Sequence, residues 1–152
     1  MRIAFYCSNK HLPEIDFSDP YSGNPGCGAA EYLHVLIPFM LNKFYYESFE
    51  LIILADKIDN MPANMKSHKV NEGIIEAASL AKKLLCDIFV FRPRMNEEKN
   101  ILSHLENLKL KSIGRAALTP TYDHLIKMSK CKFFKALVCV GENQFNYLID
   151  SP

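Results

Sequence analysis

The chain has 152 residues, of which 49% are hydrophobic and 23% charged, and its formal net charge is +1 at pH 7. This length and composition predict a single soluble globular domain with a full hydrophobic core. The chain lacks the basic excess of a non-specific nucleic-acid binder, and no run of about 18 uncharged apolar residues predicts an integral membrane segment.

Short, continuous apolar runs predict strands that are covered on both faces. These runs are Ile3–Cys7, Leu51–Ala55, Ile88–Phe91 and Ala136–Val140. A weaker strand is predicted at Ser112–Leu118, because Gly114 and Arg115 interrupt that run. A short edge strand is predicted at His68–Val70.

Between the strand runs, apolar residues recur at helical spacing. The predicted helices are Ala29–Lys43, Gly73–Leu85, Glu97–Leu108, Tyr122–Lys130 and Glu142–Ile149. Pro38 predicts a kink in the first helix, because proline removes a backbone donor and crowds the preceding turn. The alternation of strands and helices predicts an α/β fold over residues 1–152, a Rossmann-like open parallel sheet with helices on both faces.

The segments that follow the predicted strands are candidates for a binding site, because ligands of such sheets bind beyond the carboxyl ends of the strands. They include Asp56, Arg92–Arg94, Thr119–Asp123 and Gly141–Asn143. Arg92 and Arg94 offer two guanidinium groups, which bind phosphate or carboxylate in a bidentate way. The alternative is that these two arginines only solvate the end of a strand.

A glycine-rich turn, with Asn24, Gly26, Cys27 and Gly28, leads into the first predicted helix. Such a turn exposes backbone N–H groups at the positive end of the helix dipole, which suits an anion such as phosphate. The alternative is that the glycines only turn the chain. Glu31, in the first turn of the helix, either contacts a ligand or simply complements the helix dipole.

Two known phosphate-binding motifs do not fit this turn. A Walker A loop needs Lys and then Ser or Thr after its last glycine, but Ala29 and Ala30 follow Gly28. In the dinucleotide fingerprint GxGxxG, Glu31 would stand in place of the third glycine, although Asp56 imitates the ribose-binding acid of that fold. A dinucleotide-binding oxidoreductase domain is therefore a minor alternative.

A third pattern fits better. A long connection after the first strand, followed by Gly28-Ala29-Ala30-Glu31, resembles the N-terminal domain of GT-B glycosyltransferases, in particular the retaining family four (glycosyl transferase group 1-like). The segment Ala81–Phe91 looks like the helix and following strand of that family. Lys135–Glu142 is similar to a later strand, with Gly141 where a serine is common. The resemblance covers nearly the whole chain.

The resemblance implies the acceptor-side half of an enzyme that moves a sugar from a nucleotide-sugar donor to an acceptor, a small molecule or a glycan, without a cofactor or a metal. The donor would be held mainly by a C-terminal domain that this chain lacks. Gly26, Cys27 and Gly28 would offer backbone donors to the donor diphosphate. We therefore expect the chain alone to be nearly inactive, and its uncovered apolar cleft face to favour self-association.

The same resemblance does not identify a catalytic residue. The family commonly has a histidine after its fourth strand, and the matching stretch here, Arg115–Pro120, contains none. This departure keeps open a different class of protein, a Rossmann-like module without catalysis that binds a phosphate ligand or another protein. His34 and His104 are expected to be structural, and His124 to be solvated.

The cysteines predict neither a disulfide framework nor a zinc site, because their number is odd and no CxxC pair occurs. They are Cys7, Cys27, Cys86, Cys131 and Cys139. This usage, together with an N-terminus that lacks the pattern of a secretory signal, predicts a reducing, cytoplasmic setting. We expect no nucleophilic role for Cys27, because no base stands at a recognisable spacing from it.

Overall fold

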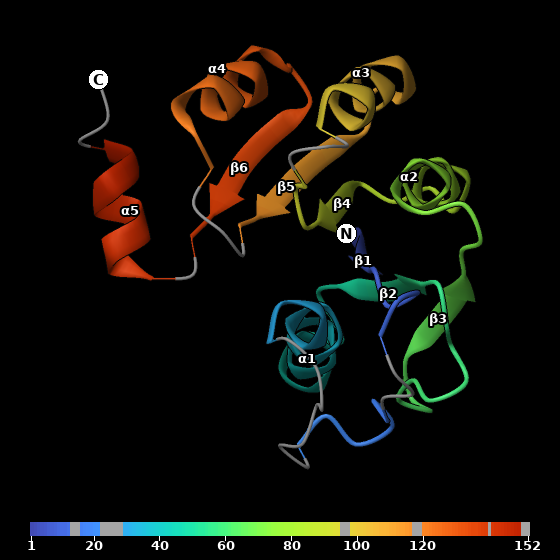
Figure 1. The fold of residues 1–152 in the computed structure, drawn as a ribbon. Coiled ribbons are helices and arrows are strands. Elements are labelled where there is room, and N and C mark those ends of the chain that lie inside the picture. The colour runs from blue at the N-terminus through green and yellow to red at the C-terminus, as the bar shows by residue number, and fades with distance from the viewer. Residues whose placement is uncertain (13–15, 22–28, 95–97, 117–119, 140, 150–152) are drawn as a thin grey trace.

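A computed structural model describes residues 1–12, 16–21, 29–94, 98–116, 120–139 and 141–149. The predicted α/β architecture is confirmed. In the described residues, six parallel strands form one open sheet, and helices lie on both of its faces (Figure 1). No helix in these ranges is long and apolar enough to cross a membrane.

The order of the strands defines where the sheet leaves a crevice. The strands are β1 (Arg2–Cys7), β2 (Glu50–Ala55), β3 (Lys66–Lys69), β4 (Ile88–Phe91), β5 (Lys111–Arg115) and β6 (Phe134–Val138). Their order across the sheet is β3-β2-β1-β4-β5-β6. Going along the chain, β2 and β3 extend the sheet on one side of β1, and β4, β5 and β6 then extend it on the other side. The strand order therefore reverses between β1 and β4, the boundary at which open α/β sheets bind ligands.

The helices cover the two faces of the sheet unequally. They are α1 (Ala29–Tyr45), α2 (Ile74–Lys83), α3 (Glu98–Leu108), α4 (Tyr122–Lys130) and α5 (Glu142–Ile149). α1 packs on one face against β1 and β2, whereas α2, α3 and α4 line the other face (Figure 1). α5 lies beyond β6 at the border of the sheet. Pro38 lies inside α1, so the carbonyl of His34 receives no helical hydrogen bond from that position.

Both faces of the central strands are buried, which explains their continuous apolar sequences. The face under α2 and α3 contains Ala4, Ile52, Leu54, Phe89 and Phe91. The face under α1 contains Ile3, Phe5, Ile53, Val90 and the helix residue Val35. The strands therefore alternate between two apolar layers, and polar side chains are left for the strand ends.

The last strand begins and ends two residues earlier than the apolar run predicts. β6 includes Phe134, which pairs with Ser112 of β5, and Cys139 follows outside the strand. The side chain of Phe134 packs against the core beneath α2 and α3. This aromatic contact extends the strand at its start. Val140, the predicted end, lies outside the described residues.

Gly114 does not interrupt β5, because close packing requires a glycine there. A Cβ atom at this position would lie 2.7 Å from Phe134 Cζ and 2.7 Å from Pro93 Cγ. Both neighbours are rigid rings that fill the space a side chain would need. The glycine therefore lets Pro93, between Arg92 and Arg94, pack directly over β5.

Candidate functional site

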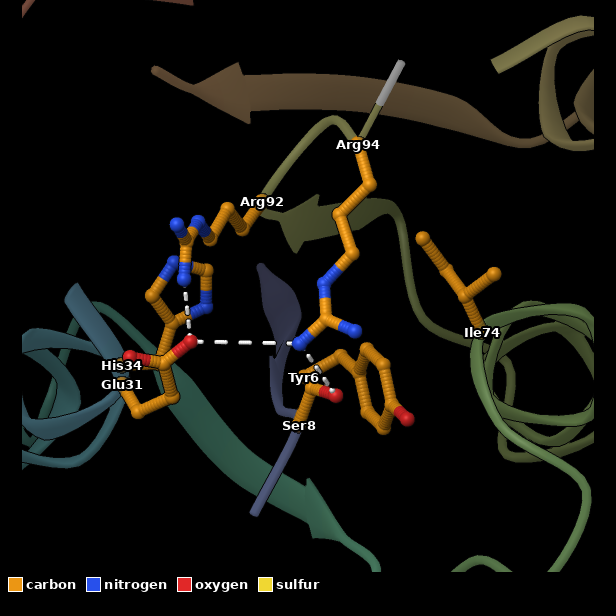
Figure 2. A pocket seen from close by; sticks show the side chains of 7 residues that line it. All are labelled: Tyr6, Ser8, Glu31, His34, Ile74, Arg92 and Arg94. Carbon is orange, nitrogen blue, oxygen red and sulfur yellow. Dashed lines mark hydrogen bonds and ion pairs between the residues drawn. The ribbon is translucent and has the colours of Figure 1, made fainter. Parts of the chain in front are cut away.

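A small pocket lies at the carboxyl edge of the sheet, at the boundary between β1 and β4. It is lined by Tyr6, Ser8, Glu31, His34, Ile74, Arg92 and Arg94 (Figure 2). These residues come from the end of β1, the start of α1, the start of α2 and the segment after β4. The pocket therefore occupies the position that the strand order marks as the ligand crevice.

The Glu31 carboxylate bridges two guanidinium groups of this pocket. Arg92 donates a hydrogen bond from Nη1 to Glu31 Oε1, and Arg94 Nη2 lies 3.9 Å from the same oxygen. The side chain of Glu31 is 8% exposed, and that of Arg92 is 27% exposed. Charges so shielded from water interact more strongly than they would at the surface. We call Glu31, Arg92 and Arg94 the carboxyl-edge cluster.

Hydrogen bonds to β1 and to the residue after it hold the members of the carboxyl-edge cluster in place. The thiol of Cys7, at the end of β1, donates to the main-chain carbonyl of Glu31 at 3.6 Å, which ties the first turn of α1 to the strand. Arg94 donates from Nη2 to Ser8 Oγ at 3.0 Å, so its guanidinium lies between Glu31 and the end of β1 (Figure 2). The cluster therefore joins α1, β1 and β4 at a single point.

A third guanidinium group acts on the same pocket. Arg115 ends β5 and is buried. Burial lowers the pKa of Arg115, the positive charge of Arg92 lowers this pKa further, and the carboxylate of Glu31 raises it. These couplings bring Arg115 into the electrostatic field of the carboxyl-edge cluster.

His34 places a buried, neutral imidazole beside Arg92 (Figure 2). Its side chain lies one turn after Glu31 on α1 and is 1% exposed. Burial lowers the pKa of His34 to about 3, and the charges of Arg115 and Arg92 add to this effect. The main chain of Tyr6 lies close enough to the ring to raise this pKa slightly. Neither ring nitrogen, however, has the geometry of a hydrogen bond to a described residue. At neutral pH the ring therefore offers one N–H donor and one nitrogen acceptor.

The pocket is nearly filled by its own side chains. Its free space is about 10 Å³, which is room for about one water molecule. A ligand that enters the pocket itself must therefore displace a side chain, and the Glu31 carboxylate is the one that already contacts the arginines.

The structure brings some of the predicted site residues together, whereas others lie outside the residues that it describes. Glu31, Arg92 and Arg94 come together, although 61 residues separate the first two. Their contact is an ion pair, so Glu31 does more than complement the helix dipole and Arg92 does more than solvate a strand end. The glycine turn, with Asn24, Gly26, Cys27 and Gly28, lies outside the described residues. The predicted backbone donors of that turn stay a prediction.

Asp56 does not line the pocket. Its carboxylate accepts a hydrogen bond from the Tyr6 hydroxyl at 3.1 Å and one from the Lys10 main chain at 3.0 Å. Burial raises the pKa of the Tyr6 hydroxyl, and the charge of Asp56 raises it further. Tyr6 is therefore a neutral donor to Asp56.

The sequence patterns do not predict Ser8 or Arg115 as site residues, and they assign His34 a structural role. Arg115 ends a strand and Ser8 follows one, so the rule that selects Arg92 also applies to them. His34 lies three positions after Glu31, a spacing that puts both side chains on one side of a helix. These signals are present in the sequence but are weak without the strand order.

His104 and His124 do not line the pocket and have polar partners of their own. His104 Nε2 lies 2.8 Å from Ser79 Oγ, a contact between α3 and α2, and His124 Nδ1 lies 2.6 Å from Thr121 Oγ1. Burial raises the pKa of the Cys86 thiol to about 11, so this cysteine is a weak nucleophile. Within the described ranges, no group of three or more His, Cys, Asp or Glu side chains could hold a metal ion.

A wider hollow, of about 370 Å³, lies at the opposite edge of the sheet. It is lined by residues that include Ser48, Glu50 and Lys66, near the starts of β2 and β3. Because open α/β sheets bind ligands at the carboxyl ends of their strands, the smaller pocket is the better candidate site.

Comparisons of the chain with protein-family models, with curated proteins and with solved structures found no match. The fold and the pocket thus define the class: an α/β protein with a Rossmann-like parallel sheet and an arginine-rich pocket at the reversal of its strand order.

Proposed function

We propose that this chain is the N-terminal, acceptor-side half of a GT-B glycosyltransferase and that the carboxyl-edge cluster contacts the phosphate-bearing part of a nucleotide-sugar donor. The position of the cluster carries the proposal. Arg92 and Arg94 follow β4, beside the reversal of strand order, and both line the pocket. Guanidinium groups match the oxygens of a phosphate in charge and geometry.

The proposed role of the arginines is electrostatic. When a sugar leaves a nucleotide diphosphate, negative charge develops on the departing phosphate oxygens. Cations fixed beside those oxygens lower the free energy of the transition state, and their effect is largest where water is excluded. Arg92 and Arg94 would supply such charge from the N-terminal half, while a C-terminal domain would bind most of the donor.

A second candidate function is a phosphate-binding module without catalysis. One observation favours it: the imidazole that lines the pocket is a weak base. Burial holds the pKa of His34 at about 3, and Arg115 ends β5 close to where the family would have a histidine. Such a pocket can bind an anion without reacting with it.

The two candidates are separated by their response to nucleotides. The melting temperature of the chain would be measured with UDP-sugars, GDP-sugars, sugar phosphates and NAD, and nucleotide release from the two kinds of donor would be followed. We expect a UDP- or GDP-sugar to raise the melting temperature more than sugar phosphates do, with almost no nucleotide release.

Three other results contradict this proposal in different ways. Stabilisation by sugar phosphates to the same extent as by nucleotide-sugars favours the non-catalytic module. Stabilisation by NAD alone favours the dinucleotide-binding alternative. Rapid release of nucleotide by the isolated chain refutes its assignment as half of an enzyme.

A further inference from the structure

The Glu31 carboxylate occupies the place that an oxyanion ligand would take. It contacts Arg92 directly and lies 3.9 Å from Arg94, so one of its oxygens faces both guanidinium groups. A phosphate oxygen binds arginines with the same charge-assisted hydrogen bonds. To these arginines a carboxylate and a phosphate thus present the same kind of acceptor.

We propose that this pocket binds a phosphate-type dianion in exchange for the Glu31 carboxylate, so that Glu31 is a built-in competitor of the ligand. This inference rests on the proposed function in treating the pocket as the ligand site. It goes further in naming the residue that opposes binding and the exchange by which the anion enters the pocket.

The charge of the pocket favours a dianion. Arg92 and Arg94, which line the pocket, contribute two positive charges and Glu31 contributes one negative charge, an excess of one. Arg115 does not line the pocket but interacts with Arg92 and Glu31 through its charge, and Asp56, which bonds to the Tyr6 hydroxyl, offsets that charge. Positive charges held close together in a partly buried site repel one another. A phosphate carrying two negative charges compensates this repulsion better than a single carboxylate does.

His34 supplies an independent reason to expect a ligand. Its ring is 1% exposed, lines the same pocket, and forms no hydrogen bond to a described residue. A buried polar group without a hydrogen bond is costly. A neutral imidazole can donate its N–H to a phosphate oxygen, and the neighbouring guanidinium groups neutralise the phosphate charge.

The exchange is sterically possible from the solvent side. The side chain of Arg94 is 37% exposed, and that of Arg92 is partly exposed, so an anion can approach both groups. The free space of about 10 Å³ does not admit a phosphate while Glu31 is in place. Rotation of the Glu31 side chain away from the arginines would vacate the space that its carboxylate fills.

The test uses inorganic pyrophosphate at constant ionic strength, so that general screening is equal in all samples. Binding is measured by calorimetry and by melting temperature in the natural chain, Glu31→Gln and Arg94→Gln. Glu50→Gln is the matched control, because Glu50 also carries two cations, Arg2 and Lys66, but at the opposite edge of the sheet.

We expect Glu31→Gln to melt below the natural chain in chloride buffer, because the arginines lose their counter-charge, and pyrophosphate to reverse this loss. Its affinity for pyrophosphate should rise about tenfold, which corresponds to about 1.4 kcal/mol. Arg94→Gln should bind at least tenfold more weakly. Glu50→Gln should bind as the natural chain does.

Two results overturn the inference. One is equal or weaker binding of pyrophosphate by Glu31→Gln. The other is undiminished binding by Arg94→Gln, which would place the anion elsewhere. Should Glu31→Gln fail to fold, the ring ¹⁵N resonances of His34 in the natural chain decide: they shift with pyrophosphate if the inference holds and stay fixed if it does not.

Results that contradict the anion site can be distinguished from results that contradict the proposed function. Pyrophosphate binding that depends on Arg94, without any preference for nucleotide-sugars, contradicts the glycosyltransferase proposal and leaves the anion site intact. Nucleotide-sugar binding that Arg94→Gln does not weaken contradicts the anion site and leaves the glycosyltransferase proposal intact.

Discussion

Two ion clusters with the same number of charges lie at opposite edges of the sheet. At the carboxyl edge, Glu31 faces two arginines. At the amino edge, Glu50 at the start of β2 forms ion pairs with Arg2 of β1 at 2.7 Å and with Lys66 of β3 at 2.6 Å. We call the latter three residues the amino-edge cluster. Each cluster therefore sets two cations against one carboxylate.

The difference between the two clusters is their contact with water. The side chains of Glu50 and Lys66 are 36% and 65% exposed, whereas that of Glu31 is 8% exposed. Hydrogen bonds from Lys66 and Arg2 lower the pKa of Glu50, but exposed ion pairs contribute at most about 1 kcal/mol and are screened by salt. Burial makes the carboxyl-edge cluster both stronger and costlier to disrupt. The position of a charge cluster thus tells more about its role than its composition does.

The two clusters should differ most in how much the free energy of unfolding falls when one cation is removed from each. Arg92→Gln leaves the buried carboxylate of Glu31 without its direct partner, and we expect a loss of about 3 kcal/mol in the free energy of unfolding. Lys66→Gln removes a partner of Glu50 that is mostly in water, and its cost should stay below about 1 kcal/mol. Urea unfolding of the two variants measures both values.

Equal losses in the free energy of unfolding for Arg92→Gln and Lys66→Gln would contradict this expectation, because burial would then not distinguish the clusters. A loss for Arg92→Gln that disappears in about 1 M salt would contradict it as well, since only exposed pairs are screened so completely at that ionic strength.

A second difference appears in acid, through His34 beside the carboxyl-edge cluster. The pKa of His34 is about 3 in the folded chain, against 6.5 for an unperturbed histidine. Between these values the unfolded chain binds a proton that the folded chain does not, so the free energy of unfolding falls as the pH falls. From pH 6.5 to 4.5 we expect a loss of about 2 kcal/mol from this residue alone.

The amino-edge cluster contributes to acid sensitivity at lower pH. The pKa of Glu50 lies below its ordinary value of 4.5, so its stabilisation is lost only as the pH falls through that lower pKa. Unfolding curves of the natural chain and of His34→Gln at several pH values separate the two effects. At about pH 5, between the two pKa values of His34, His34→Gln should take up about one proton less on unfolding than the natural chain does. An unchanged pH dependence contradicts the neutral, buried imidazole.

The fold could be predicted because its signals are local. Continuous apolar runs such as Ile88–Phe91 define buried strands, and the alternation with helical patterns defines a parallel sheet. Gly114 was harder to interpret, since its role depends on Phe134 and Pro93, which no local pattern connects to it. Sequence periodicity does not report contacts of that kind.

The candidate site could be predicted only in part. The rule that ligands bind at the carboxyl ends of strands selects Arg92 and Arg94. It does not reveal that Glu31 pairs with them, because that contact depends on which strand lies next to β1. A histidine on an apolar helix face, such as His34, is expected to be structural, and only the neighbouring arginines show its electrostatic setting.

The smallest expected difference tests how the carboxyl-edge cluster is positioned. Gly114→Ala places a methyl group 2.7 Å from both Phe134 and Pro93, and overpacking of this kind costs roughly 1 to 2 kcal/mol. Gly141→Ala is the matched control, because a Cβ atom there meets nothing within 4 Å. Since Pro93 connects Arg92 to Arg94, its displacement by Gly114→Ala should also weaken pyrophosphate binding while the amino-edge cluster keeps its geometry. Calorimetry and urea unfolding of both variants measure the two effects.

If Gly114→Ala loses stability but binds pyrophosphate as the natural chain does, the packing of Pro93 over β5 supports the sheet without orienting the arginines.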